Sequence, residues 1–190
     1  VKRAFDVVCV IVIALLASPL LIALAIATKM LSDGPVLFGH KRVGFRGLEF
    51  TCLKFRTMVS DGDEKLAEHL AANPEAADEW AKTQKLRNDP RVTAIGRFLR
   101  KTSLDELPQL LNVLRGEMSL VGPRPIVQAE VSKYGDYIHD FYLVPPGITG
   151  MWQVNGRSDT TYEQRVEMDS WYVRNWSVWI DMVYLLKTFK

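Results

Sequence analysis

Two adjacent carboxylates, Asp105 and Glu106, are the clearest candidates for catalytic residues in this 190-residue chain. They lie in the segment "SLDELPQLL" (103–111), where an apolar helical run begins. Carboxylates at the positive end of a helix could bind a divalent cation such as Mg²⁺. An aspartate can also attack phosphorus and form an acyl phosphate. The pair is therefore a candidate for catalysis and for metal binding.

Helix capping is the competing interpretation of this pair. Ser103 and Glu106 fit a capping box, in which a serine and a glutamate three residues later satisfy the free N–H groups of a helix start. Pro108 would then lie one position too deep in the helix and would remove a hydrogen bond. If Asp105 were the N-cap instead, Pro108 would fall in the first turn and be tolerated. Each capping scheme explains one acid and leaves the other without a role.

A second candidate is the arginine of the segment "SLVGPRP" (119–125), which runs from a predicted short strand into a turn. Two prolines flank Arg124 and restrict the backbone there to extended conformations. A guanidinium group held in this way suits bidentate binding of phosphate. A proline-rich turn that carries a surface arginine is the alternative.

A third candidate is the loop "VPPGITGMWQVNGR" (144–157), which contains two turn signals. Gln153 and Arg157 could supply amide and phosphate contacts to a nucleotide, and Trp152 could stack on its base. The alternative is a β-hairpin with a packed tryptophan.

Short helices and strands must position these candidate residues. The pattern of apolar and turn-forming residues predicts a mostly helical α+β fold in one domain with extensions. A β-hairpin is expected around the turn 44–47, and a polar helix pair is expected over 61–86 with a break near Asn73-Pro74. The further helices are expected at 92–100, from Ser103 to Gly116, at 161–175 and from Ser177 onward.

The N-terminal segment contains 22 residues without a charge, from Val7 to Thr28. One straight helix of this length spans roughly 33 Å, enough to cross a bilayer. However, Ser18-Pro19 interrupts the run, and basic residues flank both of its ends, which conflicts with a single crossing. A helix–break–helix that enters and leaves on the cytoplasmic face is the second interpretation. In either case residues 1–30 form a membrane segment and residues 31–190 a domain at its face.

Composition narrows the possible partners and compartments. The formal net charge is only +2, so it indicates no partner, and we expect no nucleic acid. The two cysteines show neither metal-ligand spacing nor a disulfide framework, which favours a reducing compartment. Three of the five tryptophans fall in the last twenty residues, which is typical of amphipathic helices at a membrane interface. A helix packed into the core is the alternative there.

Four features occur together: the Ser-Pro break in the apolar helix, "KFRTM" (54–58), "RxxRKTSLDELPQLLNVLRGEMSLVGPRP" (97–125) and "PGITGMWQVNGR" (146–157). In this combination the chain resembles the bacterial sugar transferase family, the monotopic polyprenyl-phosphate phosphoglycosyl transferases. The resemblance covers nearly the whole chain and is closest to the enzymes that start exopolysaccharide and O-antigen repeat units.

The resemblance implies a function. Members of the family transfer hexose-1-phosphate from a UDP-sugar to undecaprenyl phosphate and release UMP, and glucose or galactose is the sugar expected here. Asp105 would attack the β-phosphate, form a covalent phosphosugar intermediate and approach Mg²⁺, and Glu106 would assist the metal or the proton transfers. A non-catalytic scaffold at the membrane, whose arginine-rich face binds anionic lipid or an assembly partner, is the alternative function.

The resemblance also assigns the remaining site residues. Lys54, Arg100 and Arg124 match positions that hold phosphate, and Ser18-Pro19 matches the break of a re-entrant helix. The expected location is the cytoplasmic face of the bacterial inner membrane, with UDP-sugar, undecaprenyl phosphate and membrane lipids as partners. A homodimer is also possible.

Overall fold

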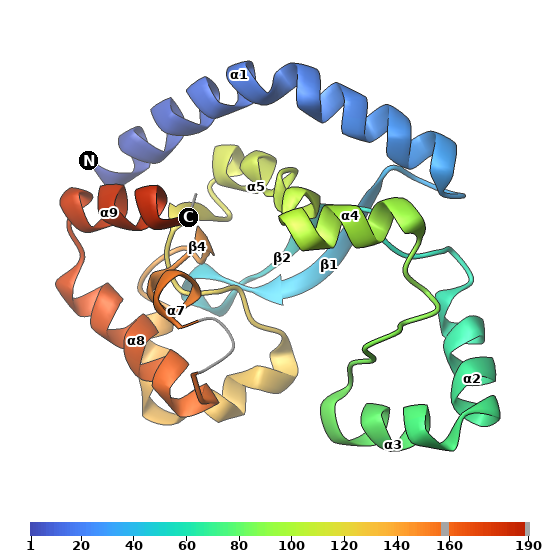
Figure 1. Ribbon diagram of the computed structural model, residues 1–190. Coiled ribbons are helices and arrows are strands. Elements are labelled where there is room, and N and C mark those ends of the chain that lie inside the picture. The colour runs from blue at the N-terminus through green and yellow to red at the C-terminus, as the bar shows by residue number, and fades with distance from the viewer. Residues whose placement is uncertain (157–159, 189–190) are drawn as a thin grey trace. The chain divides into compact units, whose positions relative to one another are not determined.

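The computed structural model describes residues 1–156 and 160–188 and is mostly helical, with two small sheets in that part of the chain (Figure 1). The predicted α+β fold class is confirmed. The chain divides into two compact units. The first unit comprises Val1–Ala17, Gly39–Leu53 and Pro108–Lys190, and the second comprises Ser18–Phe38 and Lys54–Leu107.

Helix α1 (Lys2–Leu31) is the long apolar element predicted at the N-terminus. Within the described residues, it is the helix whose length and composition would allow it to cross a membrane. Pro19 lies inside this helix, and the division between the two units falls between Ala17 and Ser18. Re-entry at Ser18-Pro19 and the division into a membrane segment and a facing domain remain predictions.

The predicted hairpin is confirmed. Strands β1 (Leu37–Val43) and β2 (Glu49–Phe55) form a two-stranded sheet, and the short 3₁₀ turn η1 (Phe45–Gly47) connects them. The turn closes where the Gly44 N–H donates to the carbonyl of Leu48, at 2.9 Å.

The other elements of the first unit follow Pro108 in the chain. They are α5 (Gln109–Arg115), β3 (Ser119–Val121), η3 (Gln128–Tyr137), α6 (Ile138–Phe141), β4 (Gly147–Thr149), α7 (Met151–Asn155), α8 (Tyr162–Asn175) and α9 (Val178–Thr188). Helix α5 ends at Gly116, whose φ of +82° is the left-handed conformation expected of a glycine at a helix end.

Strands β3 and β4 pair in parallel, with Ser119 opposite Gly147 and Val121 opposite Thr149. The short strand predicted before the Gly-Pro-Arg-Pro turn is thus confirmed. The hairpin alternative for 144–157 is wrong, because β4 leads directly into helix α7. A Cβ atom at Gly122 would lie only 2.8 Å from the Pro145 carbonyl oxygen, so this close pairing requires glycine there.

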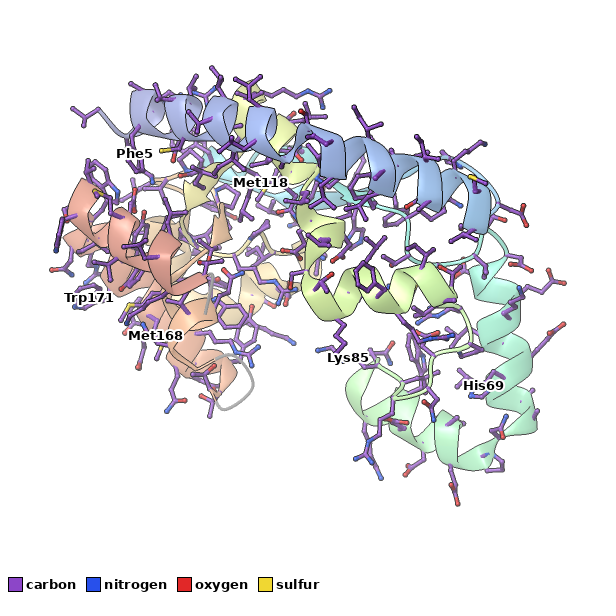
Figure 2. The ribbon with its side chains drawn as sticks, turned by 45° about the horizontal axis from the view of Figure 1, so that its top comes forward. Phe5, His69, Lys85, Met118, Met168 and Trp171 are labelled. Atoms are coloured by element: carbon purple, nitrogen blue, oxygen red, sulfur yellow. The ribbon has the colours of Figure 1, made fainter. Side chains whose placement is uncertain are left out.

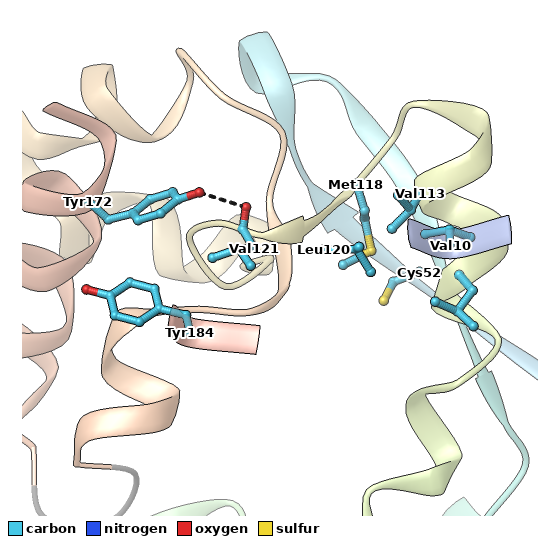
Figure 3. Close-up of a cluster of buried hydrophobic side chains, with 9 residues drawn as sticks. Val10, Cys52, Val113, Met118, Leu120, Val121, Tyr172 and Tyr184 are labelled. Carbon is cyan, nitrogen blue, oxygen red and sulfur yellow. Dashed lines mark hydrogen bonds between the residues drawn. The ribbon is translucent and has the colours of Figure 1, made fainter. Parts of the chain in front are cut away.

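The main core of the first unit joins the first half of α1 to β2, α5, β3, α8 and α9 (Figure 3). Its buried members are Val10, Cys52, Leu110, Val113, Met118, Leu120, Val121, Tyr172 and Tyr184. The Tyr172 hydroxyl lies 3.0 Å from the carbonyl oxygen of Val121 and 2.6 Å from Asp181 Oδ1, so the one polar atom of this ring is satisfied inside the core.

A buried carboxylate holds the first turn of α1 against the C-terminal helices. Asp181 is fully buried and accepts hydrogen bonds from Lys2 Nζ at 2.6 Å, from Tyr172 Oη at 2.6 Å and from Trp176 Nε1 at 3.0 Å. A buried charge is tolerated when it is paired and hydrogen-bonded in this way. The N-terminal end of α1 is therefore fixed to the body of the first unit.

A second buried carboxyl lies on α8 beside a smaller core cluster. Asp169 accepts a hydrogen bond from Tyr134 Oη at 2.9 Å, and burial raises the pKa of Asp169 to about 8. The folded chain therefore holds this proton more tightly than the unfolded chain does. Its stabilising contribution is present below the ordinary pKa of 3.8 and is lost as the pH rises through about 8.

We expect this linkage to be visible in thermal unfolding of the variant Asp169→Asn, whose side chain does not titrate. As the pH rises from about 5 to about 8.5, the midpoint of the wild type should fall relative to that of the variant. Differential scanning fluorimetry of the detergent-solubilised chain measures both midpoints. A difference that stays constant over this range would contradict the assignment.

The second unit is built on a smaller core in which Leu24 of α1, Phe55 of β2 and Leu99 are buried together. Its elements are α2 (Gly62–Ala72), α3 (Pro74–Thr83), α4 (Ala94–Thr102) and the 3₁₀ turn η2 (Leu104–Glu106). The predicted helix pair with its interruption at Asn73-Pro74 is confirmed. The helix predicted at 92–100 is shifted, because Thr93 caps it by accepting a hydrogen bond from the Gly96 N–H at 3.0 Å.

Candidate active site

The adjacent acids lie in η2, at the turn that follows α4. Ser103 ends α4 in the left-handed conformation, with a φ of +56°, and makes no side-chain cap. The following helix begins at Gln109, and Pro108 precedes it without a side-chain cap. Both capping schemes for Asp105 and Glu106 are therefore wrong, and so is a helix that starts at Ser103. Neither acid is needed to cap a helix.

Apolar contacts on either side of the acids set the orientation of the turn. Leu104 and Leu107 pack against the core cluster of Leu99 and Phe55. Asp105 lies between these two anchors and is only 8% exposed. A short 3₁₀ turn brings residues three apart onto one side, so the two leucines face the core together. The carboxyl groups are thus carried by a packed turn and not by a loose loop.

Lys54, near the end of β2, is the cation that faces the two acids. Its Nζ atom lies 2.5 Å from Glu106 Oε1 and 3.9 Å from Asp105 Oδ2. The contact with Glu106 is a short charge-assisted hydrogen bond. Strand and turn are far apart in sequence, but the structure brings all three predicted residues together.

Burial and the neighbouring charges shift the pKa of Asp105. Burial raises the pKa of Asp105 above its ordinary value, the charge of Lys54 opposes this rise, Glu106 adds to it and Arg100 opposes it. Perturbation by burial together with specific charged neighbours is typical of functional carboxyls. Asp105 is therefore the less solvated member of the pair, and the cations around it govern its charge.

Arg100, on the last turn of α4, is held by a residue that the sequence did not single out. Its Nε atom donates to Thr57 Oγ1 at 2.9 Å. The carbonyl of Thr57 in turn accepts from the Thr93 N–H at 3.1 Å, so the segment after β2 is tied to the start of α4. The only signal for this role was the position of Thr57 inside "KFRTM".

Gly96 allows this close approach of chain and helix. A Cβ atom there would lie 2.0 Å from the carbonyl oxygen of Thr57, which is backbone and cannot swing aside. We expect Gly96→Ala to destabilise the chain by about 2–3 kcal/mol, as overpacking does. Gly62→Ala is the matched control, because its new Cβ would meet Arg91 Cδ at an ordinary 3.6 Å. Equal unfolding midpoints for the two variants would show that the contact is not tight.

Three further predicted residues come after Pro108 in the chain. Arg124 and Gln153 belong to the first unit, and Arg157 lies outside the described residues. Gln153 Nε2 donates to the carbonyl of Ile148 at 3.1 Å. Trp152 is 7% exposed, so its ring is packed as in the alternative interpretation and is not open for a base to stack on. A surface hollow lined by α2, α3 and residues 85–88 contains none of the predicted residues.

The acidic pair has a donor set that fits Mg²⁺. In the described part of the chain, no three or more His, Cys, Asp or Glu side chains gather to form a metal cage. Mg²⁺ is commonly bound through one or two carboxylates, with waters and substrate phosphates as the other ligands. Asp105 and Glu106 would supply such a pair of carboxylates, while their partner Lys54 occupies the same oxygens in this structure.

Comparison with known families assigns the chain to a family. The family profile described as "bacterial sugar transferase" matches residues 1–190, the whole chain. The chain belongs to the bacterial sugar transferase family. The resemblance noted in the sequence motifs is thereby confirmed, and the adjacent acids, Lys54 and Arg100 are residues of a bacterial sugar transferase.

Named relatives of this bacterial sugar transferase come from several organisms. It is 56% identical over 190 residues to an undecaprenyl-phosphate galactose phosphotransferase of Salmonella typhimurium, a match that covers 100% of the chain and 40% of the relative. It is 53% identical over 188 residues to the exopolysaccharide production protein ExoY of Rhizobium meliloti, covering 98% and 83%. A UDP-glucose:undecaprenyl-phosphate glucose-1-phosphate transferase of Escherichia coli K12 is 44% identical over 198 residues, covering 100% and 39%. The chain thus spans about two fifths of the length of two of these relatives.

Proposed function

We propose that this bacterial sugar transferase moves hexose-1-phosphate from a UDP-sugar to undecaprenyl phosphate, with Asp105 as the nucleophile. The observation that carries the proposal is the buried Asp105 carboxyl beside Glu106, with Lys54 and Arg100 as neighbouring cations. The printed names of the relatives, which include galactose and glucose transferases acting on undecaprenyl phosphate, support the reaction class. The product would begin exopolysaccharide or O-antigen synthesis.

In the first half-reaction, an Asp105 carboxylate oxygen attacks the β-phosphorus of the donor. The bond between this phosphorus and the oxygen that bridges it to the α-phosphorus breaks, and UMP leaves with the electron pair. The sugar phosphate remains on Asp105 as an acyl phosphate. In the second half, a phosphate oxygen of undecaprenyl phosphate attacks the same phosphorus, and the Asp105 carboxylate leaves.

The neighbouring cations neutralise charge during both steps. Phosphoryl transfer depends mainly on positioning and on electrostatic stabilisation. Lys54 Nζ, already 3.9 Å from Asp105, would contact the transferred phosphoryl oxygens, and Arg100 would be oriented toward them by Thr57. Glu106 holds Lys54 in place. Mg²⁺ held by the two acids would offset the charge of the donor diphosphate.

The membrane topology we propose is re-entrant, with α1 entering and leaving on the cytoplasmic face. At one end, Arg3 donates to the carbonyl of Leu114 at 2.7 Å within the first unit. At the other end, Leu24 packs with Phe55 and Leu99 within the second unit. A helix that crossed the bilayer once would place one of these ends on the far side, away from the rest of its unit. Both sets of contacts therefore support re-entry at Ser18-Pro19.

Helix α9 would rest on the membrane surface. Trp179, Met182 and Leu186 share one face of this helix and are 71%, 41% and 71% exposed. The opposite side carries Asp181 and Tyr184, which are buried. On the neighbouring helix α8, Trp171 is also exposed (Figure 2). Exposed tryptophan and aliphatic side chains on one face suit the interfacial region of a bilayer.

A donor panel tests the proposed function directly. The purified chain in lipid nanodiscs is given undecaprenyl phosphate, Mg²⁺ and one UDP-sugar at a time, and UMP is measured together with lipid-linked sugar. We expect UDP-glucose or UDP-galactose to yield both products in equal amounts, and removal of Mg²⁺ with EDTA to stop the reaction. No UMP from any donor would refute the proposal and favour a non-catalytic scaffold.

A further inference from the structure

A short antiparallel ladder in the second unit joins the segment after β2 to the segment before α4. The Val59 N–H donates to the carbonyl of Arg91 at 2.9 Å. The Thr93 N–H donates to the carbonyl of Thr57 at 3.1 Å. Because the Thr57 hydroxyl also accepts the hydrogen bond from Arg100, the position of this ladder determines where the Arg100 guanidinium is held.

The turn that leads into the ladder is closed by local hydrogen bonds. The Val92 N–H donates to the carbonyl of Asp89 at 3.1 Å, and Pro90 follows Asp89 in the turn. The Arg91 N–H donates to Asp89 Oδ1 at 3.0 Å. Aspartate and proline both favour these positions of a turn. The turn alone needs only an acceptor oxygen at residue 89, which an asparagine would also supply.

The charge of Asp89 makes a further contact that the turn does not require. Arg91 Nε donates to Asp89 Oδ1 at 2.8 Å, and Arg91 Nη2 donates to Asp89 Oδ2 at 2.7 Å. The side chains of Arg91 and Asp89 are only 13% and 11% exposed. The guanidinium carbon of Arg91 lies 4.9 Å from the centre of the Trp80 ring on α3. A bidentate pair has a fixed geometry, so it holds residue 91 at the start of the ladder.

Asp89 also interacts electrostatically with the arginine of the site. Hydrogen bonds from Arg91 hold the pKa of Asp89 below its ordinary value against the opposing effect of burial, and the charge of Arg100 lowers it further. The charge of Arg100 also opposes the rise in the pKa of Asp105. One guanidinium thus interacts with both a fixed acid and the proposed nucleophile.

We propose that Asp89 is a positioning residue for Arg100. Its bidentate pair with Arg91 fixes the ladder, the ladder fixes Thr57, and Thr57 directs the guanidinium of Arg100 toward the substrate phosphates. Asp89 touches no reacting atom in this scheme. A mostly buried ion pair adds little net stability, because desolvation offsets the attraction, but its geometry is what a preorganised cation requires. The inference rests on the proposed function, which gives Arg100 its role at the transferred phosphoryl group.

A double-mutant cycle tests this role with the full chain in lipid nanodiscs. We expect Asp89→Asn, which keeps the turn acceptor and loses the charge, to lower the rate of UMP release about tenfold. Arg100→Lys removes the Nε–H group that binds Thr57. In that background the Asp89→Asn change should cost less than about twofold, because the two residues act as one unit. An equal loss in both backgrounds would overturn the inference, since the effect would then not depend on Arg100.

The matched control is Asp78→Asn. Asp78 belongs to the same unit and pairs with Lys82 at 2.6 Å on the exposed surface of α3, and we expect its replacement to leave UMP release unchanged. Where Asp89→Asn does not fold, Arg91→Lys takes its place in the cycle, because lysine keeps the charge and loses the fork.

Hydrogen exchange measured by mass spectrometry tests the ladder without turnover. We expect the peptides that contain Val59 and Thr93 to exchange faster in Asp89→Asn than in the wild type, because the ladder opens more often. Equal exchange in the two chains would contradict the inference even in an active transferase. Failure of the proposed function is distinct, because it appears as an absence of UMP from the wild type itself.

Discussion

Asp105→Asn should lower the rate of UMP release by about a thousandfold or more, because loss of a catalytic nucleophile has effects of this size. The amide is nearly the same size as the carboxyl and fits the same packed turn. It cannot form an acyl phosphate, so both half-reactions stop. UMP release from the purified variant in nanodiscs measures the effect, and an unchanged unfolding midpoint shows that the turn is intact.

The control for this variant is Asp136→Asn. Asp136 is exposed and lies in η3, outside the proposed site. Its replacement removes one carboxylate from the chain and should leave UMP release unchanged. Full activity of Asp105→Asn would exclude Asp105 as the nucleophile, even if the chain transfers sugar phosphate by another route.

Replacement of Lys54 by methionine should lower turnover by about a hundredfold, as removal of one preorganised charge at a reacting centre does. The amino group contacts Glu106 at 2.5 Å and Asp105 at 3.9 Å, so its loss leaves two neighbouring acids without this cation. Their mutual repulsion then raises the pKa of Asp105 further and lowers the fraction that is ionised. The variant should also bind the anionic donor more weakly.

Two further variants test whether the loss of activity comes from the contact of Lys54 with the two acids. Lys54→Arg keeps the positive charge and should retain more activity than Lys54→Met. Its planar guanidinium group does not reproduce the contact that the lysine amine makes with the acids. Lys65→Met removes a lysine of the same unit that pairs with Asp61 at 3.3 Å, and we expect it to be fully active. Equal losses in Lys65→Met and Lys54→Met would mean that the effect is general and does not depend on the contact with the acids.

The sequence predicted the parts of this fold that depend on local chemistry. The turn at 44–47, the interruption at Asn73-Pro74 and the helix end at Gly116 follow from glycine and proline preferences, and the structure confirms all three. The adjacent acids were singled out because capping could not account for both. In the structure they cap neither neighbouring helix and instead face Lys54.

The predictions that were wrong concern features that depend on tertiary contacts. No local rule places Ser103 in the left-handed conformation or starts the next helix six residues later at Gln109. Packing of Leu104 and Leu107 into the core of the second unit provides the reason, since it fixes the turn that carries the acids. The role of Thr57 was missed for the same reason, because its contact with Arg100 joins segments 43 residues apart.

The loop around Trp152 is another segment whose structure depends on tertiary contacts. Its composition suited base stacking and a hairpin with a packed tryptophan equally well. The ring is packed, as in the second interpretation, but it lies at the start of a short helix and has two arginines over it. Residue spacing does not predict the contact of Arg165 with this ring, because Arg165 belongs to α8, a separate element of the chain. Cation–π pairs between distant residues leave no periodic signal in a sequence.

Mass spectrometry of the chain incubated with UDP-sugar and Mg²⁺, in the absence of undecaprenyl phosphate, tests the central claim most directly. The account predicts a hexose phosphate on the peptide that contains Asp105, which is lost when the lipid phosphate is added and product forms. Rapid product formation by a chain that never carries a sugar phosphate on Asp105 would contradict it, because donor and acceptor would then react in a single displacement.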